Sequence, residues 1–547
     1  MSDRRPLPYL RHFRHLRKTA FRAALLLVLL GAAAGWLGCR PDRRPEDRRP
    51  RFLVVGIDGG EWRVIRALWA EGKLPHLRGL ADRGVAGTLR TAYNSSPVIW
   101  TTIATGVNPP EHGITDFVVA TPQGDVPISS TVRKVPALWN MLTRAKRRVS
   151  VFGWWGSWPA EEINGVMVTD RALIDLPGRV SPESYLPAFL ENVEAAKAEP
   201  GLFQTEWEPE LRDLALTRSA ERLVREDGHD LLLVYFRGPD MVSHNYWKYY
   251  EPEAFSRVDP VELARYKGRV PQVYEAVDQE IGRLLEAVPE DTNVLVISDH
   301  GFHAAKDEEV KVLLDMDKVL ERLGYLARSS GSNPAIDFSR TRFYAYATPP
   351  HRRAKLIRFS LAGREEGGTV RPEERAALRQ ALAADLATVT YAGGAPVFYV
   401  RNARPREVEE GADFVVGVSP EGATPVLLVK GERFEGAIES VSRISGTHTQ
   451  NTHGILIAAG PDIDPAAQLD GIRIHDITPT LLYGLGLPVA EDFAGKPWTA
   501  LFTPELRQRQ PQRTIRSWGK REQGGAVSIS PADEKLLDEL RSLGYIN

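Results

Sequence analysis

Cysteine is nearly absent from this sequence, whose 547 residues contain only Cys39. A single cysteine excludes an internal disulfide framework and any metal site built from several thiolates. An excess of charge of one sign is lacking too, because 70 Lys and Arg residues balance 71 Asp and Glu residues to a formal charge of −1. The chain therefore lacks the overall positive charge that would indicate a nucleic-acid partner. Any metal ligands must be histidines and carboxylates.

The hydrophobic run near the N-terminus is shorter than a typical membrane-spanning helix. The uncharged segment AALLLVLLGAAAGWLG, residues 23–38, has 16 residues, whereas a membrane-spanning helix usually needs about 20. It follows a basic segment, which is typical of an export signal. The residues before Cys39 resemble a bacterial lipoprotein processing site, although Trp36 departs from that pattern; an uncleaved signal anchor and soluble secretion are the alternatives. We expect a membrane-anchored protein of the bacterial periplasm or cell envelope.

Short apolar runs alternate with helical patterns along most of the chain. The strand candidates are residues 52–57, 149–154, 166–169, 231–236, 294–298, 426–429 and 455–459. The helix candidates are residues 61–72, 97–105, 136–146, 208–226, 268–287 and 476–486. This alternation predicts an α/β fold with a mostly parallel central sheet and helices on both faces.

The alternation divides the chain into five parts. We expect a signal or anchor and linker over 1–51, a core in two pieces over 52–301 and 446–503, an inserted α+β cap subdomain over 302–445, and a C-terminal arm over 504–547. Within the cap, the patterns predict helices near 308–323 and 372–389 and short strands near 396–400 and 413–417. The arm is expected to be extended over 504–530 and to end in an amphipathic helix over 531–543.

Histidines and carboxylates flank four of the predicted strands. Because the carboxyl ends of parallel strands meet at one sheet edge, we expect most of these groups to converge there. Oxygen and nitrogen ligands of this kind suit a divalent transition metal such as zinc. The candidates are Asp58 after 52–57, Asp240 and His244 after 231–236, Asp299 and His300 after 294–298, and His448 or His453 before 455–459.

Ser96-Pro97 has the pattern of a helix start, with a hydroxyl at the N-cap and proline at the first helical position. The simplest interpretation of Ser96 is a structural cap. A helix N-terminus also offers free N–H groups and a positive dipole end, which suit a phosphate. A serine at that place, close to a metal ion, is also suited to be a nucleophile.

Six motifs together resemble the alkaline phosphatase superfamily, specifically its type I phosphodiesterase and nucleotide pyrophosphatase branch. They span residues 52 to about 490 and read GIDGGEW, SSPVIWTTIATGVNPPEHGI, GPDMVSHNYW, VISDHGF, SGTHTQNTHGILIAAG and IHDITPTLLYGLGLP. The resemblance implies an alkaline-phosphatase-like fold and a hydrolase of phosphodiester or pyrophosphate bonds. It also implies two divalent metal ions, usually zinc with manganese as an alternative, and a covalent phospho-serine intermediate.

The resemblance also implies roles for individual residues. Ser96 would be the nucleophile, with Ser95 as the alternative, and Asn94 would either donate to a phosphoryl oxygen or only form a turn. His448 is preferred over His453 because HTQN resembles a metal-binding run of related phosphoglycerate mutases. One metal would be held by Asp58, Ser96, Asp299 and His300, and the other by Asp240, His244 and His448.

Three other functions remain open at this point. A sulfatase is disfavoured, because its nucleophile motif requires arginine two residues after the proline and this chain has Ile99. A transferase moving a phospho-head group to a glycan or lipid would use the same intermediate. A non-catalytic, metal-stabilised envelope protein would bind a partner through its C-terminal helix. The expected partners are a phosphate-ester substrate and, through the N-terminus, a membrane.

Overall fold

The computed structural model describes residues 51–121, 124–199, 209–226, 228–330, 334–346, 353–449, 451–521 and 527–546. The signal or anchor prediction, including Cys39, lies outside these residues. Within them, no helix combines the length and the apolar character needed to cross a membrane.

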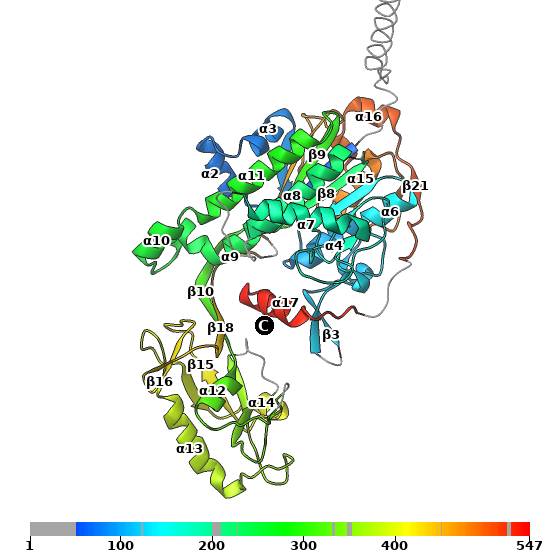
Figure 1. The fold of residues 1–547 in the computed structure, drawn as a ribbon. Helices are drawn as coiled ribbons and strands as arrows, with labels where there is room; N and C mark the ends of the chain where they lie inside the picture. Colours follow the sequence, from blue (N-terminus) through cyan, green and yellow to red (C-terminus); the bar gives the residue numbers. More distant parts are fainter. Residues whose placement is uncertain are drawn as a thin grey trace, which may run out of the picture. The chain divides into compact units, whose positions relative to one another are not determined.

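A central sheet of eight strands forms the body of the fold (Figure 1). Its strands, in spatial order, are β2 (Val85–Leu89), β19 (Gly454–Ala459), β9 (Thr292–Ser298), β1 (Arg51–Ile57), β8 (Leu231–Phe236), β5 (Val149–Phe152), β6 (Met167–Val168) and β7 (Val180–Ser181). The five strands from β9 to β6 run parallel, while β2 and β19 at one side and β7 at the other form antiparallel pairs. The predicted mostly parallel sheet is therefore confirmed.

Helices cover both faces of this sheet, because side chains alternate along each buried strand. In β1, Leu53 and Val55 pack into one hydrophobic core, whereas Phe52 and Val54 pack into the other. The first core is covered by α2 (Trp62–Ala70), α3 (Pro75–Arg83), α7 (Leu186–Lys197), α8 (Pro209–Glu226) and α11 (Arg269–Ala287). The second is covered by α4 (Ser96–Thr105), α6 (Leu138–Arg144), α15 (Ile477–Gly484) and α16 (Pro504–Arg509).

The direction of β19 decides where the second half of the chain meets the first. β19 pairs antiparallel with β9, with Leu456 opposite Ile297. Its first residues therefore lie at the edge where β1, β8 and β9 end. The loop that leads into β19, which contains His448 and His453, arrives at the edge that already carries Asp58 and Asp299.

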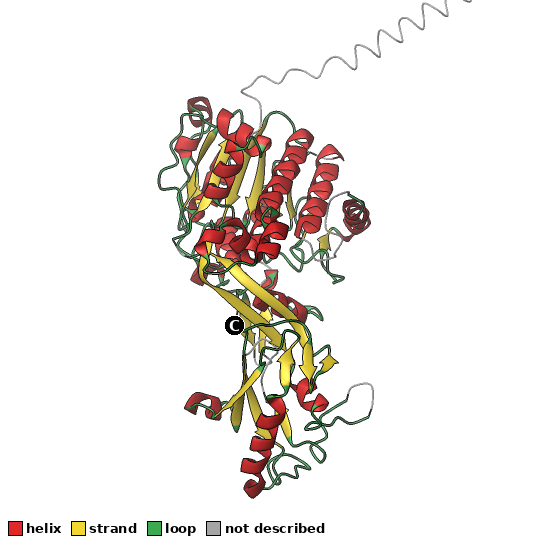
Figure 2. Cartoon of the chain, turned by 90° about the vertical axis from the view of Figure 1, so that its left-hand side faces the viewer, coloured by secondary structure: helices red, strands yellow, loops and turns green. Residues whose placement is uncertain are grey.

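An insertion, residues 303–447, separates β9 from β19. It begins and ends in one long antiparallel pair, β10 (His303–Leu314) and β18 (Ile438–Thr447), which Figure 2 shows as the strands connecting it to the body. Between them lie a four-stranded and a three-stranded sheet and the helices α12 (Met316–Arg322), α13 (Arg375–Leu386) and α14 (Pro405–Glu409). The strands are β11 (Phe343–Ala345), β12 (Ala354–Phe359), β13 (Val389–Tyr391), β14 (Phe398–Arg401), β15 (Phe414–Val418), β16 (Leu427–Val429) and β17 (Glu432–Phe434). These elements bury a hydrophobic core of their own.

One local prediction within the insertion was wrong. The helix expected near 308–323 forms only as α12, because residues up to Leu314 belong to β10. There, Val312 and Leu314 lie on the same face of the strand and pack into the core of the insertion, while β18 takes the backbone hydrogen bonds. Strand pairing therefore overrides the helix propensity of the charged residues. The strand expected at 426–429 is confirmed as β16, which pairs in the three-stranded sheet.

The arm predicted to be extended over 504–530 is partly regular. It starts with α16 and contains β21 (Thr514–Ile515), which pairs with β20 (Val489–Ala490). The amphipathic helix forms as α17 (Asp533–Ser542), and its leucines Leu537 and Leu540 are buried within the chain. The face that the non-enzymatic hypothesis assigned to a partner is therefore used internally.

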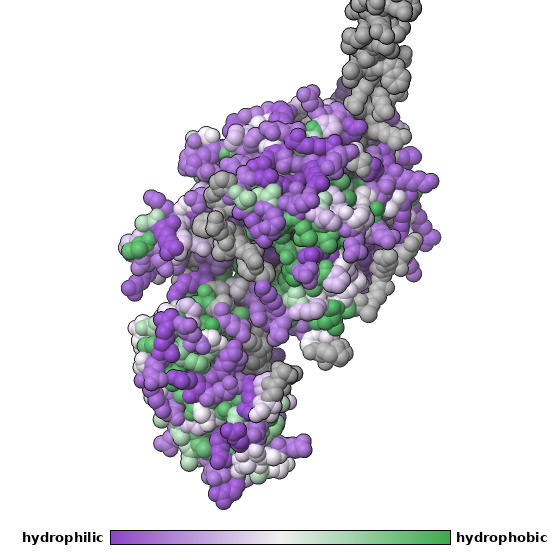
Figure 3. Space-filling view, in the orientation of Figure 1, coloured by the Kyte–Doolittle hydropathy of each residue, from purple (hydrophilic) through white to green (hydrophobic). Residues whose placement is uncertain are grey.

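The surface seen in Figure 3 is mainly hydrophilic, with hydrophobic side chains gathered near the centre of the view. In the described part of the chain, the large hydrophobic side chains that remain exposed are Leu173, Leu190, Val261, Tyr346, Tyr399, Val408 and Ile529. Burial in the separate cores of the body and the insertion therefore accounts for most of the hydrophobic content.

Candidate metal centre and nucleophile

The turn after β1 fixes the first candidate ligand. Asp58 follows the last residue of β1 and is buried. Gly59 has φ +69°, a left-handed conformation that permits the sharp turn. Its N–H donates to Asp299 Oδ1 (3.2 Å), and the N–H of Gly60 donates to Ser298 Oγ (2.8 Å). The backbone after β1 is thereby tied to the residues that end β9.

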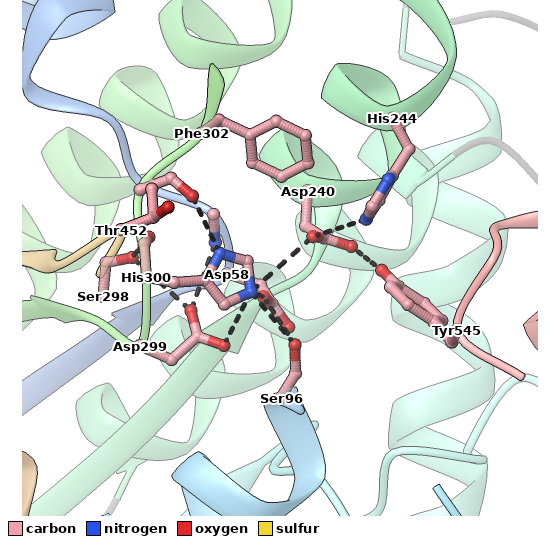
Figure 4. Close-up of polar contacts among 12 residues, drawn as sticks. Asp58, Ser96, Asp240, His244, Ser298, Asp299, His300, Phe302, Thr452 and Tyr545 are labelled. Carbon is pink, nitrogen blue, oxygen red and sulfur yellow. Dashed lines mark hydrogen bonds and ion pairs between the residues drawn. The ribbon is translucent and has the colours of Figure 1, made fainter. Parts of the chain in front are cut away.

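Two further elements deliver the remaining ligands to the same edge. Helix α9 (Gly238–Tyr250) starts directly after β8 and carries Asp240 in its first turn and His244 one turn later. This i, i+4 spacing places both on one helical face, as the sequence predicted. His448 follows the last residue of β18. Figure 4 shows the side chains of Asp240 and His244 directed toward those of Asp58 and His300.

The first group of candidate ligands consists of Asp58, Asp299 and His300, whose potential ligand atoms lie within 4.8 Å of one another. His300 Nε2 is 3.4 Å from Asp58 Oδ1 and 3.3 Å from Asp299 Oδ2. Its Nδ1–H donates to the carbonyl of Gly301 (3.0 Å), so that Nε2 keeps its lone pair for the group. Such a backbone hydrogen bond typically orients a metal-binding histidine.

The second group consists of Asp240, His244 and His448, whose potential ligand atoms also lie within 4.8 Å of one another. His244 Nε2 lies 3.4 Å from Asp240 Oδ1, and its Nδ1 bonds to the carbonyl of Gly446 (3.0 Å). The two groups adjoin, because His300 Nε2 is 3.9 Å from Asp240 Oδ1. The structure thus brings together all six protein ligands that the resemblance implied, apart from the serine.

Several polar atoms of these groups are buried without a hydrogen-bond partner among the described residues: Asp240 Oδ1, His244 Nε2, Asp299 Oδ2 and His448 Nδ1. Each such atom costs about 1–3 kcal/mol when left unsatisfied. Four of them in adjoining groups need a common explanation. Carboxylate and imidazole donors around this space fit divalent ions such as zinc or manganese.

The electrostatics of the groups agree with this fit. Burial, and then the charge of Asp240, raise the pKa of Asp58 above its usual value. Burial, and then the charge of Asp58, raise the pKa of Asp299 well above its usual value. Burial, and then nearby His300, lower the pKa of His448 well below its usual range. The histidine is therefore neutral and able to coordinate, and a divalent cation would relieve the repulsion between the carboxylates.

Ser96 lies beside the first group at the start of α4. Its Oγ is 3.3 Å from Asp58 Oδ1 and 3.2 Å from His300 Nε2, and the residue is buried. The prediction that Ser96 is the N-cap was wrong by one position: Ser95 is the N-cap, and Ser96 is the first helical residue. Ser96 cannot cap the helix because its hydroxyl turns toward the ligands.

The structure also places the alternatives that the sequence left open. Ser95 Oγ is buried without a hydrogen-bond partner in the part of the chain that the structure describes, and it makes no cap hydrogen bond. His453 Nδ1 accepts from the N–H of Thr91 (3.4 Å), outside both groups. Asn94 is exposed at the entrance to α4. The geometry therefore favours Ser96 and His448 over their alternatives.

Sequence reasoning missed the residues that hold the outer oxygens of two carboxylates. The hydroxyl of Tyr235, near the end of β8, donates to Asp58 Oδ2, as does Trp155 Nε1 (3.2 Å). The hydroxyl of Tyr545, beyond α17, donates to Asp240 Oδ2. Tyr235 carried no motif. Tyr545 had one signal, a Leu-Gly-Tyr run after an amphipathic helix, which is typical of a helix terminus but not of an active site.

A parallel sheet edge with two adjoining carboxylate–histidine groups and a serine at a helix start defines a class of metal-dependent hydrolases. Residues 52–433 match the family model described as type I phosphodiesterase/nucleotide pyrophosphatase, and the chain belongs to this family. The resemblance to this branch of the alkaline phosphatase superfamily is confirmed, and the protein is an enzyme.

Solved structures with a related chain trace have low identity to this chain. Murine ectonucleotide pyrophosphatase/phosphodiesterase 5 has a TM-score of 0.41 at 15% identity and covers 83% of this chain and 100% of its own. The human protein of that name has a TM-score of 0.40 at 14% sequence identity, with the same coverage of both chains. Phosphonoacetate hydrolase from Sinorhizobium meliloti 1021, in complex with phosphonoacetate, has a TM-score of 0.40 at 15% sequence identity. The match covers 80% of this chain and 95% of its own. No curated protein sequence matches the chain.

Proposed function

We propose that this enzyme hydrolyses phosphodiester or pyrophosphate bonds through a phospho-serine intermediate on Ser96, assisted by two divalent ions. One observation carries the proposal: Ser96 Oγ is buried at a helix start and lies 3.2 Å from His300 Nε2 in the first group. A purely structural metal site has no use for a hydroxyl at that place.

The residues that would hold the ions follow from the two groups. Asp58, Asp299 and His300, with Ser96, would hold one, and Asp240, His244 and His448 the other. When bound, zinc or manganese ions supply positive charge that lowers the pKa of the serine hydroxyl and stabilises the leaving oxygen.

The chain's own residues perform the remaining work. Ser96 loses its proton to solvent, and its Oγ forms a bond to phosphorus as the bond to the leaving oxygen breaks. The start of α4 favours negative charge and would orient a phosphoryl oxygen toward Ser96. Asn94, exposed just before α4, would donate a hydrogen bond to that oxygen. Water then attacks phosphorus from the opposite face, releases the product and restores the serine proton. One water is consumed per bond.

The charge of the groups supports a diester or pyrophosphate over a simple monoester. Asp58, Asp240 and Asp299 contribute three negative charges, and the pKa of His448 is held low, so it adds no positive charge. Two divalent ions would balance these three charges and that of the deprotonated Ser96, leaving no surplus of positive charge, so the single negative charge of a phosphodiester centre would be accommodated better than two. A monoester dianion would require additional cationic groups.

We also propose that the enzyme acts outside the cytoplasm, attached to a membrane through the N-terminal segment. The support is the basic and apolar pattern of residues 1–38 before Cys39. Replacing Cys39 with alanine separates the possibilities: loss of lipid labelling and release from the membrane fraction supports acylation, whereas unchanged retention supports an anchor.

The test of the reaction combines metal analysis with a substrate screen. Purified protein should contain up to two zinc or manganese ions per chain and hydrolyse bis-nitrophenyl phosphate faster than nitrophenyl phosphate. Adding glycerol or a sugar tests transfer, because a phosphorylated acceptor would reveal the transferase. Bound metal without turnover of any ester would refute the hydrolytic proposal for this site.

A further inference from the structure

Tyr545 reaches the second ligand group from a distant part of the chain. Its hydroxyl donates to Asp240 Oδ2, and its ring lies edge-on to His244 with centroids 5.1 Å apart (Figure 4). On its other side the ring stacks on Phe117, with centroids 4.5 Å apart and planes inclined by 9°. The phenol is therefore fixed in both position and orientation.

The sequence at the end of α17 sets this direction. Gly544 has φ +84°, which favours glycine, and its N–H donates to the carbonyl of Arg541 (3.1 Å). The N–H of Tyr545 donates to the carbonyl of Leu540 (2.9 Å). Together these bonds form a Schellman motif, in which a left-handed glycine ends the helix and turns the next residue back along it. The run Leu543-Gly544-Tyr545 thus aims the phenol at Asp240.

Helix α17 is itself held firmly against the body. Leu537, Leu540 and Leu543 are buried. Asp533 pairs with Arg171 (3.0 Å), and both of these side chains are largely buried, with exposed fractions of 8% and 4%. Glu539 pairs with Arg237 (2.9 Å), the residue that follows β8 and precedes α9. The helix is therefore anchored next to the element that carries Asp240.

The contact of Tyr545 repeats the arrangement of the first group. Asp58 Oδ2 accepts from the hydroxyl of Tyr235, while Asp58 Oδ1 faces His300 Nε2 at 3.4 Å. Asp240 Oδ2 accepts from the hydroxyl of Tyr545, while Asp240 Oδ1 faces His244 Nε2 at 3.4 Å. Within the described residues, Asp240 Oδ1 has no hydrogen-bond partner. In each group, one tyrosine holds the outer carboxylate oxygen and the inner oxygen faces the ligand space.

We propose that Tyr545 is a positioning residue of the second metal group: its hydroxyl fixes Asp240 so that Oδ1 remains aimed at the ion. This inference rests on the two-ion function proposed above. Outer-shell partners of metal-binding carboxylates typically change metal affinity by about 10–100-fold when removed. Tyr545→Phe keeps the ring on Phe117 and removes only the hydroxyl, so it isolates this contribution.

Zinc titration of the full-length metal-free chain, in competition with a chromophoric chelator, tests the inference. Asp299→Asn weakens the first group and leaves the second to be measured, whereas Asp240→Asn does the reverse. In the Asp299→Asn background, Tyr545→Phe should weaken zinc binding about 10–100-fold. In the Asp240→Asn background it should change nothing. Tyr235→Phe should show the opposite pattern.

Thermal unfolding of each variant confirms that the fold is retained, and Tyr399→Phe, at an exposed position, is the matched control. Unchanged zinc affinity of the second group in Tyr545→Phe would overturn the inference while leaving the two-ion function intact. Tighter binding would also overturn it, because the hydroxyl would then compete with the ion. A wild-type chain that binds no zinc or manganese would instead refute the two-ion function, and the inference with it.

Discussion

The imidazole rings of His300 and His448 stack face to face, with centroids 3.6 Å apart and planes inclined by 10°. The two histidines belong to different ligand groups, so the stack joins the groups physically. Two cationic imidazoles could not lie so close in a buried site, and the pKa of His448 is held well below its usual range by burial and then by His300. The stack therefore keeps a neutral histidine ready to coordinate.

Ser96→Ala should lower turnover of a phosphodiester by about 10⁴-fold or more, because the nucleophile is lost. Metal content and thermal unfolding should stay close to those of the wild type. Ser95→Ala is the matched control and should retain most activity, since Ser95 Oγ has no hydrogen-bond partner among the described residues. Steady-state kinetics and elemental analysis check both. Wild-type rates in Ser96→Ala would transfer the nucleophile to another residue.

Removing metal should destabilise the enzyme. Asp58, Asp240 and Asp299 are all buried, and bound cations relieve their repulsion. Zinc at 100 times its dissociation constant should stabilise the folded chain by about 2.7 kcal/mol for each site. Thermal unfolding of chelator-treated protein, followed during zinc addition, measures the shift. Because magnesium prefers oxygen ligands, it should restore much less stability, and equal restoration by magnesium would contradict the proposed donor set.

Tyr274→Phe should destabilise the fold by about 1–3 kcal/mol, because it leaves buried backbone groups unpaired. The Tyr274 hydroxyl accepts from the N–H of Glu61 (2.9 Å) and donates to the carbonyl of Gly59 (2.9 Å), so it fixes the turn after Asp58. Urea unfolding measures the loss. Tyr399→Phe on the surface should change stability by less than about 0.5 kcal/mol. Equal effects of the two substitutions would show that the turn does not depend on Tyr274.

His112 should make stability depend on pH. Burial, and then Arg133, lower its pKa from 6.5 to about 3. Above pH 6.5, His112 is unprotonated in both the folded and the unfolded chain, so its full contribution to the unfolding free energy is present. As the pH falls from 6.5 toward 3, His112 binds a proton in the unfolded chain but not in the folded chain. The unfolding free energy then falls by at most about 1.4 kcal/mol per pH unit.

His112→Asn tests this dependence. The variant loses the contact with Thr102 Oγ1 (3.1 Å) and should be less stable than the wild type at pH 7. The difference should narrow as the pH is lowered to 4, because asparagine does not titrate. Urea unfolding at several pH values measures it. Parallel stability curves for the two proteins would show that His112 binds a proton as readily in the folded chain as in the unfolded chain.

The sequence predicted the central sheet and most candidate ligands from local patterns, whereas the division of those ligands into two groups was implied by the family resemblance. Asp58 and Asp299 directly follow apolar strands, and Asp240 and His244 share a helical face, so spacing alone placed them. The strand β10 was assigned to a helix, since its pairing with β18 comes from residues more than a hundred positions away. Tyr545 was missed for a similar reason: it lies 305 positions from Asp240, and no periodicity encodes that contact.

The strand pair β10 and β18 also joins the insertion to the body of the fold next to the candidate ligands. His300 lies three residues before the start of β10, and His448 directly follows the end of β18. The stacked imidazoles therefore lie where this two-stranded ribbon meets the body. A bend or twist of that ribbon would be transmitted to both rings at once.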